Sequence, residues 1–198
     1  MARTLQYKAD GIAPAACMES VAPRMSVAVC DHVLETPNLR MQVVERSDLA
    51  NYIELLDDPE VLRYIGVEAG KPLSRAEVED IVEGAVKGWA LRGYGRWTVF
   101  ERASEEFVGF IGFRCEKGIP ELLSVIKEKY WGSGYAFEGS KKCIDHGFKN
   151  LGFTEICAYA RPENVRARAM LGRLDAVFEG IVNFHGVDGA KYVILPKG

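Results

Sequence analysis

The stretch that decides the fold of this 198-residue chain is Glu121-Leu-Leu-Ser-Val-Ile-Lys-Glu-Lys-Tyr-Trp-Gly-Ser-Gly-Tyr-Ala-Phe-Glu138. Its first half has the pattern of a strand over residues 121–127, and a helical period begins directly after Gly132-Ser133-Gly134. The backbone N–H groups of residues 132–136 therefore stand at the positive end of a helix dipole without intrahelical partners. The two glycines leave room for an anion beside the backbone, so the turn predicts a phosphate site.

Two interpretations of this turn remain open from its residues alone. It can be a phosphate site, or it can be a tight strand-to-helix connection that carries glycines for its backbone geometry. The chain has no G-x-x-x-x-G-K-[ST] motif, and the G-x-G lacks the third glycine of a dinucleotide fingerprint. Lys127, Lys129, Lys141 and Lys142 add positive charge near the turn in the sequence.

The remaining patterns predict a single α/β domain. Short connections join the strands expected over residues 96–127, which favours antiparallel neighbours and excludes a doubly wound nucleotide fold. The predicted strands are 39–44, 96–101, 107–114, 121–127, 155–160, 177–184 and 191–195, the last two joined by a turn at Asp188-Gly189, and the predicted helices begin at Ser47, Asp58, Ser74, Tyr135 and Asn164. This order indicates a three-layer α/β/α sandwich around a mixed, mostly antiparallel sheet.

The domain is expected to occupy residues 34–198, and residues 1–33 lack a sustained period. We interpret residues 1–33 as an N-terminal arm that is disordered or adds one edge strand from Met25 to Cys30. The arm could also contribute to a homodimer.

Composition excludes several classes of protein. Hydrophobic residues make up 48% of the chain and charged residues 27%, so a core can form without disulfide or metal support. The net charge of −3 gives no chain-wide field for nucleic acid. No apolar run is long enough to cross a membrane, and we expect a cytoplasmic protein. The five cysteines form no C-x-x-C pair and the three histidines no H-x-x-x-H motif, so no metal site is predicted.

Tyr130-Trp-Gly-Ser-Gly-Tyr-Ala-Phe-Glu138 resembles the acetyl-coenzyme A signature of the RimJ/RimL branch of the GNAT N-acetyltransferases. Other segments resemble that family in the same order along residues 34–196. They are Thr36-Pro-Asn-Leu-Arg40, Leu56-Asp-Asp-Pro-Glu-Val61, Phe107-Val-Gly-Phe-Ile-Gly112 and Arg161-Pro-Glu-Asn164.

The resemblance implies a splayed sheet whose gap admits the pantetheine arm of acetyl-coenzyme A beside the strand at residues 121–127. The implied cofactor-binding residues are Ser124, Val125, Ile126, Lys129, Trp131, Gly132, Ser133, Gly134, Tyr135, Ala136 and Asn164. A basic segment containing Arg161, Arg166, Arg168 and Arg173 could meet the 3′-phosphate, although each of these arginines could instead belong to a solvated face.

Glu121 is the candidate catalytic residue. It lies ten residues before Trp131, the spacing of the family's strand glutamate, and it could take the proton of the acceptor ammonium. It could equally cap the strand after Pro120 or face solvent. The backbone N–H near Val125 is the expected partner of the thioester carbonyl.

The acid that protonates the departing thiolate is not evident, since the family's serine and tyrosine positions hold Ala167 and Leu171. Water, the substrate ammonium, Tyr159 or Tyr135 could replace them. The sequence thus predicts an acetyl-coenzyme A-dependent N-acetyltransferase that acts by direct transfer on a primary amine. The acceptor would be a small molecule or a protein N-terminus. The alternative is a non-catalytic acyl-coenzyme A-binding or interaction module.

Overall fold

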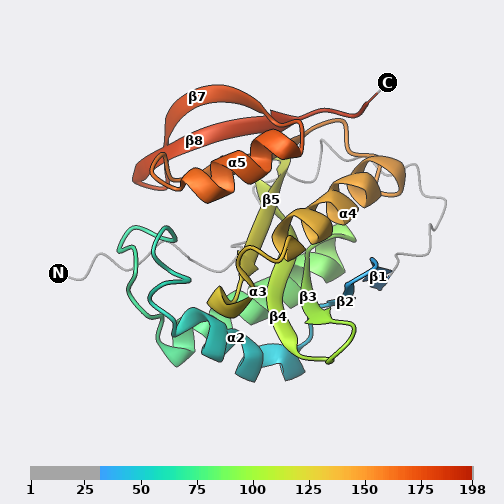
Figure 1. Ribbon diagram of the computed structural model, residues 1–198, viewed down its shortest axis with the longest axis vertical. Coiled ribbons are helices and arrows are strands. Elements are labelled where there is room, and N and C mark those ends of the chain that lie inside the picture. The colour runs from blue at the N-terminus through green and yellow to red at the C-terminus, as the bar shows by residue number, and fades with distance from the viewer. Residues whose placement is uncertain (1–31, 198) are drawn as a thin grey trace.

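An eight-stranded sheet in the order β1-β2-β3-β4-β5-β6-β8-β7 is the framework of the computed structural model, which describes residues 32–197 (Figure 1). The strands are β1 (Val33–Glu35), β2 (Leu39–Val43), β3 (Arg96–Glu101), β4 (Phe107–Glu116), β5 (Ile119–Ile126), β6 (Ile156–Ala160), β7 (Val177–Phe184) and β8 (Val187–Ile194). The helices are α2 (Leu49–Leu56), α3 (Arg75–Arg92), α4 (Tyr135–Lys149) and α5 (Val165–Arg173), with short 3-10 turns η1 (Arg46–Asp48) and η2 (Glu128–Tyr130). Most of the expected arm, including the strand predicted from Met25 to Cys30, lies outside the described residues.

Helices cover both faces of the sheet, which confirms the predicted three-layer α/β/α sandwich. On one face, α2 and α3 bury Tyr52, Leu55, Val78 and Ile81 in one apolar cluster. On the other face α4 and α5 pack against a second cluster (Figure 1). All neighbouring strands are antiparallel except β5 and β6, so the mixed, mostly antiparallel sheet is confirmed too.

The parallel pair β5 and β6 opens the sheet. Their register contains only one pair of facing residues, Glu121 with Cys157. Beyond Glu121 the two strands diverge, so the remaining length of β5 has a neighbour, β4, on one side only. The splayed sheet implied by the family resemblance is therefore present.

The helix predicted from Asp58 is wrong. Residues 58–70 form a series of turns in which Leu62 N–H bonds the Asp58 carbonyl and Ile65 N–H bonds the Leu62 carbonyl. The Asp58 side chain accepts from Glu60 N–H at 2.9 Å, as at a helix start, but Gly66 and Gly70 take positive φ of 75° and 78°, so the turns do not continue as a helix. This segment is instead a loop that folds over one end of the sheet.

The turn predicted at Asp188-Gly189 is also wrong. The β7–β8 hairpin pairs Phe184 with Val187, so its two turn residues are His185 and Gly186. Both have positive φ, 51° and 88°, as is required by the two-residue hairpin turn whose backbone twist matches that of the flanking strands. The Asp188-Gly189 pair lies within β8, because backbone pairing along the whole hairpin outweighs the local turn preference of Asp-Gly.

None of the helices between residues 32 and 197 has the length and apolar character that crossing a membrane would require.

Close backbone contact between β3 and β4 yields a test of the fold. Gly112 has φ +153°, and a Cβ atom there would stand 2.4 Å from the Gly95 carbonyl oxygen and 2.7 Å from Arg96 Cα. We expect Gly112→Ala to lower the free energy of unfolding by about 3 kcal/mol, measured by urea denaturation. Gly172→Ala in α5, with no neighbouring atom within 4 Å, is the control and should be neutral or stabilising by up to about 1 kcal/mol. Equal stability of the two variants would contradict this packing.

Candidate active site

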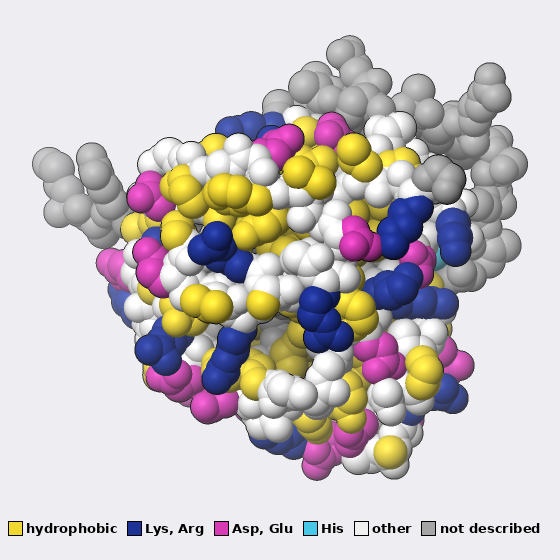
Figure 2. All heavy atoms as spheres, turned by 45° about the horizontal axis from the view of Figure 1, so that its top comes forward, with side chains coloured by type: hydrophobic (Ala, Val, Ile, Leu, Met, Phe, Trp, Pro, Cys, Tyr) yellow, Lys and Arg dark blue, Asp and Glu magenta, His cyan; other side chains and the backbone are white. Residues whose placement is uncertain are grey.

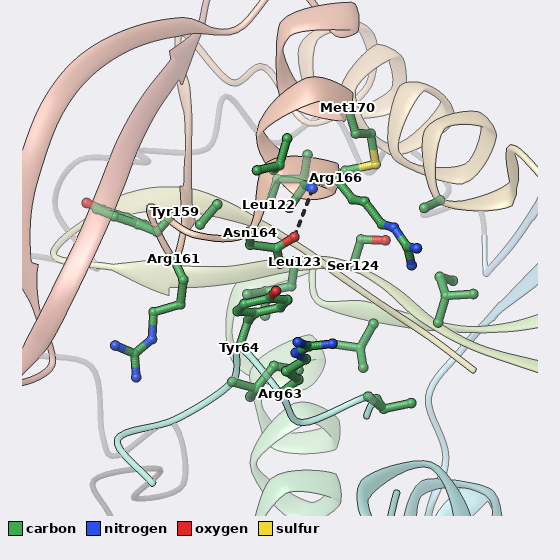
Figure 3. A pocket seen from close by; sticks show the side chains of 18 of the residues that line it. Arg63, Tyr64, Leu122, Leu123, Ser124, Tyr159, Arg161, Asn164, Arg166 and Met170 are labelled. Atoms are coloured by element: carbon green, nitrogen blue, oxygen red, sulfur yellow. Dashed lines mark hydrogen bonds between the residues drawn. The ribbon is translucent and has the colours of Figure 1, made fainter. Parts of the chain in front are cut away.

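A cavity of about 1150 Å³ occupies the gap between β5 and β6. Its walls come from β5, β6, the first turn of α4, one face of α5, the loop at residues 60–67 and the β7–β8 turn. In Figure 3, Asn164, Arg166 and Met170 lie on one side and Arg63 and Tyr64 on the other. The predicted site residues that line the cavity are Glu121, Ser124, Val125, Ile126, Trp131, Gly132, Gly134, Tyr135, Ala136 and Asn164.

Alternation along β5 separates two sets of side chains. Val125 packs against the cluster beneath α2 and α3, whereas Leu122 and Ile126 belong to the cluster beneath α4 and α5. Because successive strand residues face opposite sides, Glu121 shares the face of Val125 and Ser124 shares the face of Leu122. The carboxylate and the serine hydroxyl therefore serve opposite faces of the sheet.

The backbone of β5 offers donors to the gap. Lys127 N–H donates to the Val108 carbonyl of β4 at 2.9 Å, and antiparallel pairing alternates this direction along the strand. The N–H groups of Ser124 and Ile126 consequently point away from β4 and toward the cavity, whereas that of Val125 points to β4. The donor expected near Val125 thus corresponds to either of its neighbours.

The turn before α4 forms an open cradle for an anion. Gly132 and Gly134 have φ of 84° and 89°, and a Cβ atom on either would meet nothing within 4 Å. Within residues 32–197, no group accepts a hydrogen bond from the amides of Gly132, Gly134 or Ala136. Ser133 differs, since its amide and its hydroxyl bond the Tyr130 carbonyl at 3.3 and 2.6 Å and it does not line the cavity.

Three side-chain contacts fasten this turn to the end of β3 and the loop that follows it. Lys129 and the Tyr130 hydroxyl bond Glu106 at 2.6 and 2.7 Å, and the Tyr135 hydroxyl donates to Glu101. The Glu101 carboxylate raises the pKa of Tyr135 to about 12, so Tyr135 is a poor proton donor. Lys129 is neutralised by its carboxylate partner and lies outside the cavity lining.

Positive charge at the cavity comes from arginines. Arg166 and Arg173, seven residues apart on one face of α5, lie 5.4 Å from the Trp131 ring and 4.2 Å from the Phe137 ring. Neither forms an ion pair with another described residue. Figure 2 shows Lys and Arg side chains around a hollow in the face it presents. The α5 arginines therefore keep their charge available beside the amide cradle.

The other two arginines of the predicted basic segment are structural. Arg161 donates to the Gly66 carbonyl at 2.7 Å and so ties the loop at residues 60–67 to the end of β6. Arg168 donates to the Tyr192 hydroxyl and the Pro162 carbonyl, both at 3.0 Å, and is not in the cavity lining.

Asn164 and Ser124 present polar atoms on the α5 side of the cavity. The Asn164 side-chain oxygen accepts from Ala167 N–H at 3.1 Å, so it caps α5 and leaves its amide donors for other partners (Figure 3). The Ser124 hydroxyl is buried without a hydrogen-bond partner in the described part of the chain. An orphaned hydroxyl on a cavity wall, together with the cradle, fits a ligand that carries amides and phosphates.

Glu121 is buried rather than solvent-facing, with 2% of its side chain exposed. Both carboxylate oxygens accept from Arg114, at 2.6 Å from Nε and 3.0 Å from Nη2. Burial raises the pKa of Glu121, and the Arg114 guanidinium opposes that shift. The sequence analysis missed Arg114, although a two-residue turn at Lys117-Gly118 sets the register that places it opposite Glu121.

Arg63, Tyr64 and His185 were also missed as cavity residues. Arg63 and Tyr64 lie in the loop wrongly expected to be helical, and His185 lies in the turn wrongly placed at residues 188–189. No local motif marks these positions, because the loop and the hairpin reach the cavity only after the sheet has formed.

Comparison with known proteins decides the family. The acetyltransferase (GNAT) domain family matches residues 21–177. The chain belongs to this acetyltransferase family. An uncharacterized N-acetyltransferase, p20, from Bacillus licheniformis is 28% identical over 153 residues, covering 75% of this chain and 84% of the relative.

Solved structures share the fold of this acetyltransferase. A GNAT-family acetyltransferase from Bacillus anthracis superposes with a TM-score of 0.69 at 24% identity, covering 82% of this chain and 98% of that one. RimL, a ribosomal L7/L12 alpha-N-protein acetyltransferase in complex with coenzyme A, gives a TM-score of 0.70 at 16% identity, covering 82% and 97%. The acetyl donor of the family is acetyl-coenzyme A, which fits the cradle and the orphaned hydroxyl.

The buried ion pair gives a pH-dependent test of stability. Arg114→Met leaves the Glu121 carboxyl buried without its guanidinium, so its pKa should rise further. The protonated carboxyl is tolerated at low pH, and the cost of burying its charge grows as pH rises through that pKa. We expect a loss of about 3–5 kcal/mol in unfolding free energy at neutral pH and a smaller loss at about pH 4, measured by urea denaturation.

The double variant Arg114→Met/Glu121→Gln is the matched control, since it removes the unpaired charge. It should recover most of the loss at neutral pH. Equal destabilisation by Arg114→Met at both pH values would show that the ion pair is not the cause.

Proposed function

We propose that the protein transfers the acetyl group of acetyl-coenzyme A directly to a primary amine, carried by a protein N-terminus or by a small molecule. The observation that carries the proposal is a single cavity with an amide cradle and the arginines of α5 at one end and the buried Glu121 at the other. Such a cavity suits a phosphorylated thioester entering from one face of the sheet and a cationic amine entering from the other.

The proposed cofactor site uses backbone groups more than side chains. The amides of Gly132, Gly134 and Ala136 would hold the pyrophosphate, and the N–H groups of Ser124 and Ile126 would meet the pantetheine arm and the thioester carbonyl. The thioester supplies an activated acyl group for amine attack. The proposed cofactor residues lining the cavity are Ser124, Val125, Ile126, Trp131, Gly132, Gly134, Tyr135, Ala136 and Asn164, with Arg166 and Arg173 added.

Direct transfer is favoured over a covalent acyl-enzyme. Among the described residues Cys143 and Cys157 are free thiols, and both are buried. Burial raises the pKa of Cys157 to about 12, so it remains protonated near neutral pH and is a weak nucleophile.

Glu121 is the proposed proton acceptor for the amine. It lines the cavity on the face opposite Ser124, and burial raises the pKa of its carboxyl, which makes the carboxylate a stronger proton acceptor. The acceptor would enter between the loop at residues 60–67 and the β7–β8 turn, which both line the cavity. Pairing with a second copy of the chain and a cytoplasmic location stay predictions.

Cofactor binding is tested first by its effect on stability. Acetyl-coenzyme A at about a hundredfold excess over its Kd should stabilise the protein by ~2.7 kcal/mol, measured by denaturation.

The arginines on α5 yield a separate test of cofactor recognition. If Arg166 and Arg173 meet the 3′-phosphate, Arg166→Gln/Arg173→Gln should weaken binding of coenzyme A about tenfold or more. The same variant should bind 3′-dephospho-coenzyme A almost as well as the wild type does, as measured by calorimetry.

Lys129→Gln is the control for that experiment, because Lys129 pairs with Glu106 outside the cavity. It should leave both affinities unchanged. A greater loss of coenzyme A affinity in Lys129→Gln than in the arginine variant would contradict this assignment and would place the 3′-phosphate near Lys129.

Turnover is tested by thiol release over a panel of peptides, polyamines and amino sugars. Glu121→Gln should lower kcat/KM about 100-fold or more, since it removes the proton acceptor. The loss should be largest near neutral pH, where the amine is protonated. It should become smaller as the assay pH approaches the pKa of the amine, because unprotonated amine can attack without first losing a proton to a base. A pH–rate profile that is unchanged in Glu121→Gln would remove Glu121 from the mechanism, and no thiol release with any amine would refute the proposed activity.

A further inference from the structure

A second carboxylate with a histidine lies beside the proposed base. His185 Nε2 is 3.2 Å from Glu116 Oε2, and both residues neighbour the Arg114–Glu121 pair. Arg114 and Glu116 alternate along β4, so their side chains share the sheet face of Glu121. The proposed function assigns no role to this pair, although His185 lines the cavity.

The backbone at His185 is unusual for its residue type. Two-residue hairpin turns of this kind favour Asn, Asp or Gly where φ is positive, and His185 has φ 51°. The adjacent Phe184 stacks on Tyr159 with ring centroids 3.9 Å apart, and Arg114 lies 5.4 Å from the Phe184 ring. The hairpin is thereby packed onto the sheet so that His185 reaches Glu116.

Exposure differs sharply along this group. The Glu121 side chain is 2% exposed and that of Glu116 10%, whereas that of His185 is 42% exposed. A proton on Glu121 has little direct access to bulk water, but a proton on His185 exchanges with solvent. The imidazole is also the side chain that gains and loses protons most readily near neutral pH.

Acetylation of an ammonium must release a proton from this site. When R–NH₃⁺ reacts with a thioester, the C–N bond forms, the C–S bond breaks and the nitrogen loses two protons. The departing thiolate takes one proton to become a thiol, and the other must reach solvent in every turnover. A buried base therefore needs a route by which it is deprotonated again.

We propose that His185, held by Glu116, is the proton-transfer residue that exchanges protons between the buried Glu121 carboxyl and solvent. The inference rests on the proposed function, since it assumes that Glu121 receives the amine proton. In each turnover the imidazole takes the proton of the Glu121 carboxyl through water in the cavity and gives it to solvent, so the Glu121 carboxylate is restored and the imidazole is unchanged.

The other titratable groups near His185 do not take part in this exchange, so Glu116 and Glu121 are its proton-exchanging neighbours. The titratable and charged residues on the packed strands include Arg114, Glu116, Glu121, Cys157, Tyr159, Glu179, Asp188 and Lys191. Burial raises the pKa values of Cys157 and Tyr159, so both stay neutral near pH 7. Lys191 pairs with Glu179 at 2.7 Å, and Asp188 is exposed beside the turn.

Buffer dependence distinguishes proton transfer from a structural role. In dilute buffer without imidazole, we expect His185→Gln to lower kcat about tenfold, less than the roughly 100-fold or greater loss from removing the base itself. Added imidazole should restore most of that loss because it delivers and removes protons in place of the side chain. Glu116→Gln should lower kcat in the same direction, and KM for acetyl-coenzyme A should stay unchanged in both variants.

Glu179→Gln is the matched control, because it neutralises a carboxylate of the same hairpin that pairs with Lys191 away from the cavity. It should leave kcat and its buffer dependence unchanged. A second measurement, NMR titration of His185, should give a lower pKa in Glu121→Gln than in the wild type, since the variant removes a neighbouring negative charge.

Three results would overturn the proposal: an unchanged kcat in His185→Gln, a loss that imidazole does not restore, or a His185 pKa that is the same with and without Glu121. Failure of the proposed function would look different. If the wild type released no thiol with any amine, both the activity and the proton route would be refuted, whereas full activity of His185→Gln would refute only the route.

Discussion

The divergence of β5 from β6 after Glu121 is the constraint on which the rest of the site depends. A strand in the middle of a sheet normally pairs on both sides, and its backbone is then unavailable to a ligand. Here a single facing pair, Glu121 with Cys157, holds the two strands together before they separate. The separation creates the cavity and exposes the inward N–H groups of β5 along one of its walls.

Both ends of the opening are held by contacts within the chain. At one end the turn before α4 is fixed by Glu101 and Glu106, which accept from Tyr135, Tyr130 and Lys129. These contacts neutralise Lys129 and leave the backbone amides, with the α5 arginines, as the proposed anion site. At the other end Arg161 bonds the Gly66 carbonyl and so joins the loop at residues 60–67 to β6. A cradle that is already formed loses little conformational freedom when a ligand binds.

The two ends also differ in charge, which matches the two reactants of the proposed transfer. Among residues 32–197, Arg166 and Arg173 have no carboxylate partner and lie beside the amide cradle, whereas Glu121 and Glu116 lie on the opposite face with Arg114 and His185. Alternation along β5 produces this division, because neighbouring side chains of one strand face opposite sides of the sheet. A phosphorylated thioester and an amine can therefore approach the same strand from opposite faces.

Much of the fold was predictable from local patterns. The glycine-bearing turn before α4, the Ser74 and Asn164 caps and the strand periods at residues 96–101 and 177–184 all act over a few residues, and each is confirmed. The errors occurred where local preference met a longer-range constraint. Asp58 begins turns rather than a helix, and hairpin pairing shifted the turn from Asp188-Gly189 to His185-Gly186.

By itself the sequence determined the layered α/β architecture, the glycine-bearing turn before α4 and the family resemblance, because these depend on periodicity and on glycines at defined positions. Only the tertiary structure decided which charges face the cavity. Lys129 turns to Glu106, Arg168 turns to Tyr192, and Glu121 is buried against Arg114, while His185 joins Glu116 across the sheet. Those pairings connect residues from separate elements, so they follow from strand register and packing, which no local stretch of sequence specifies.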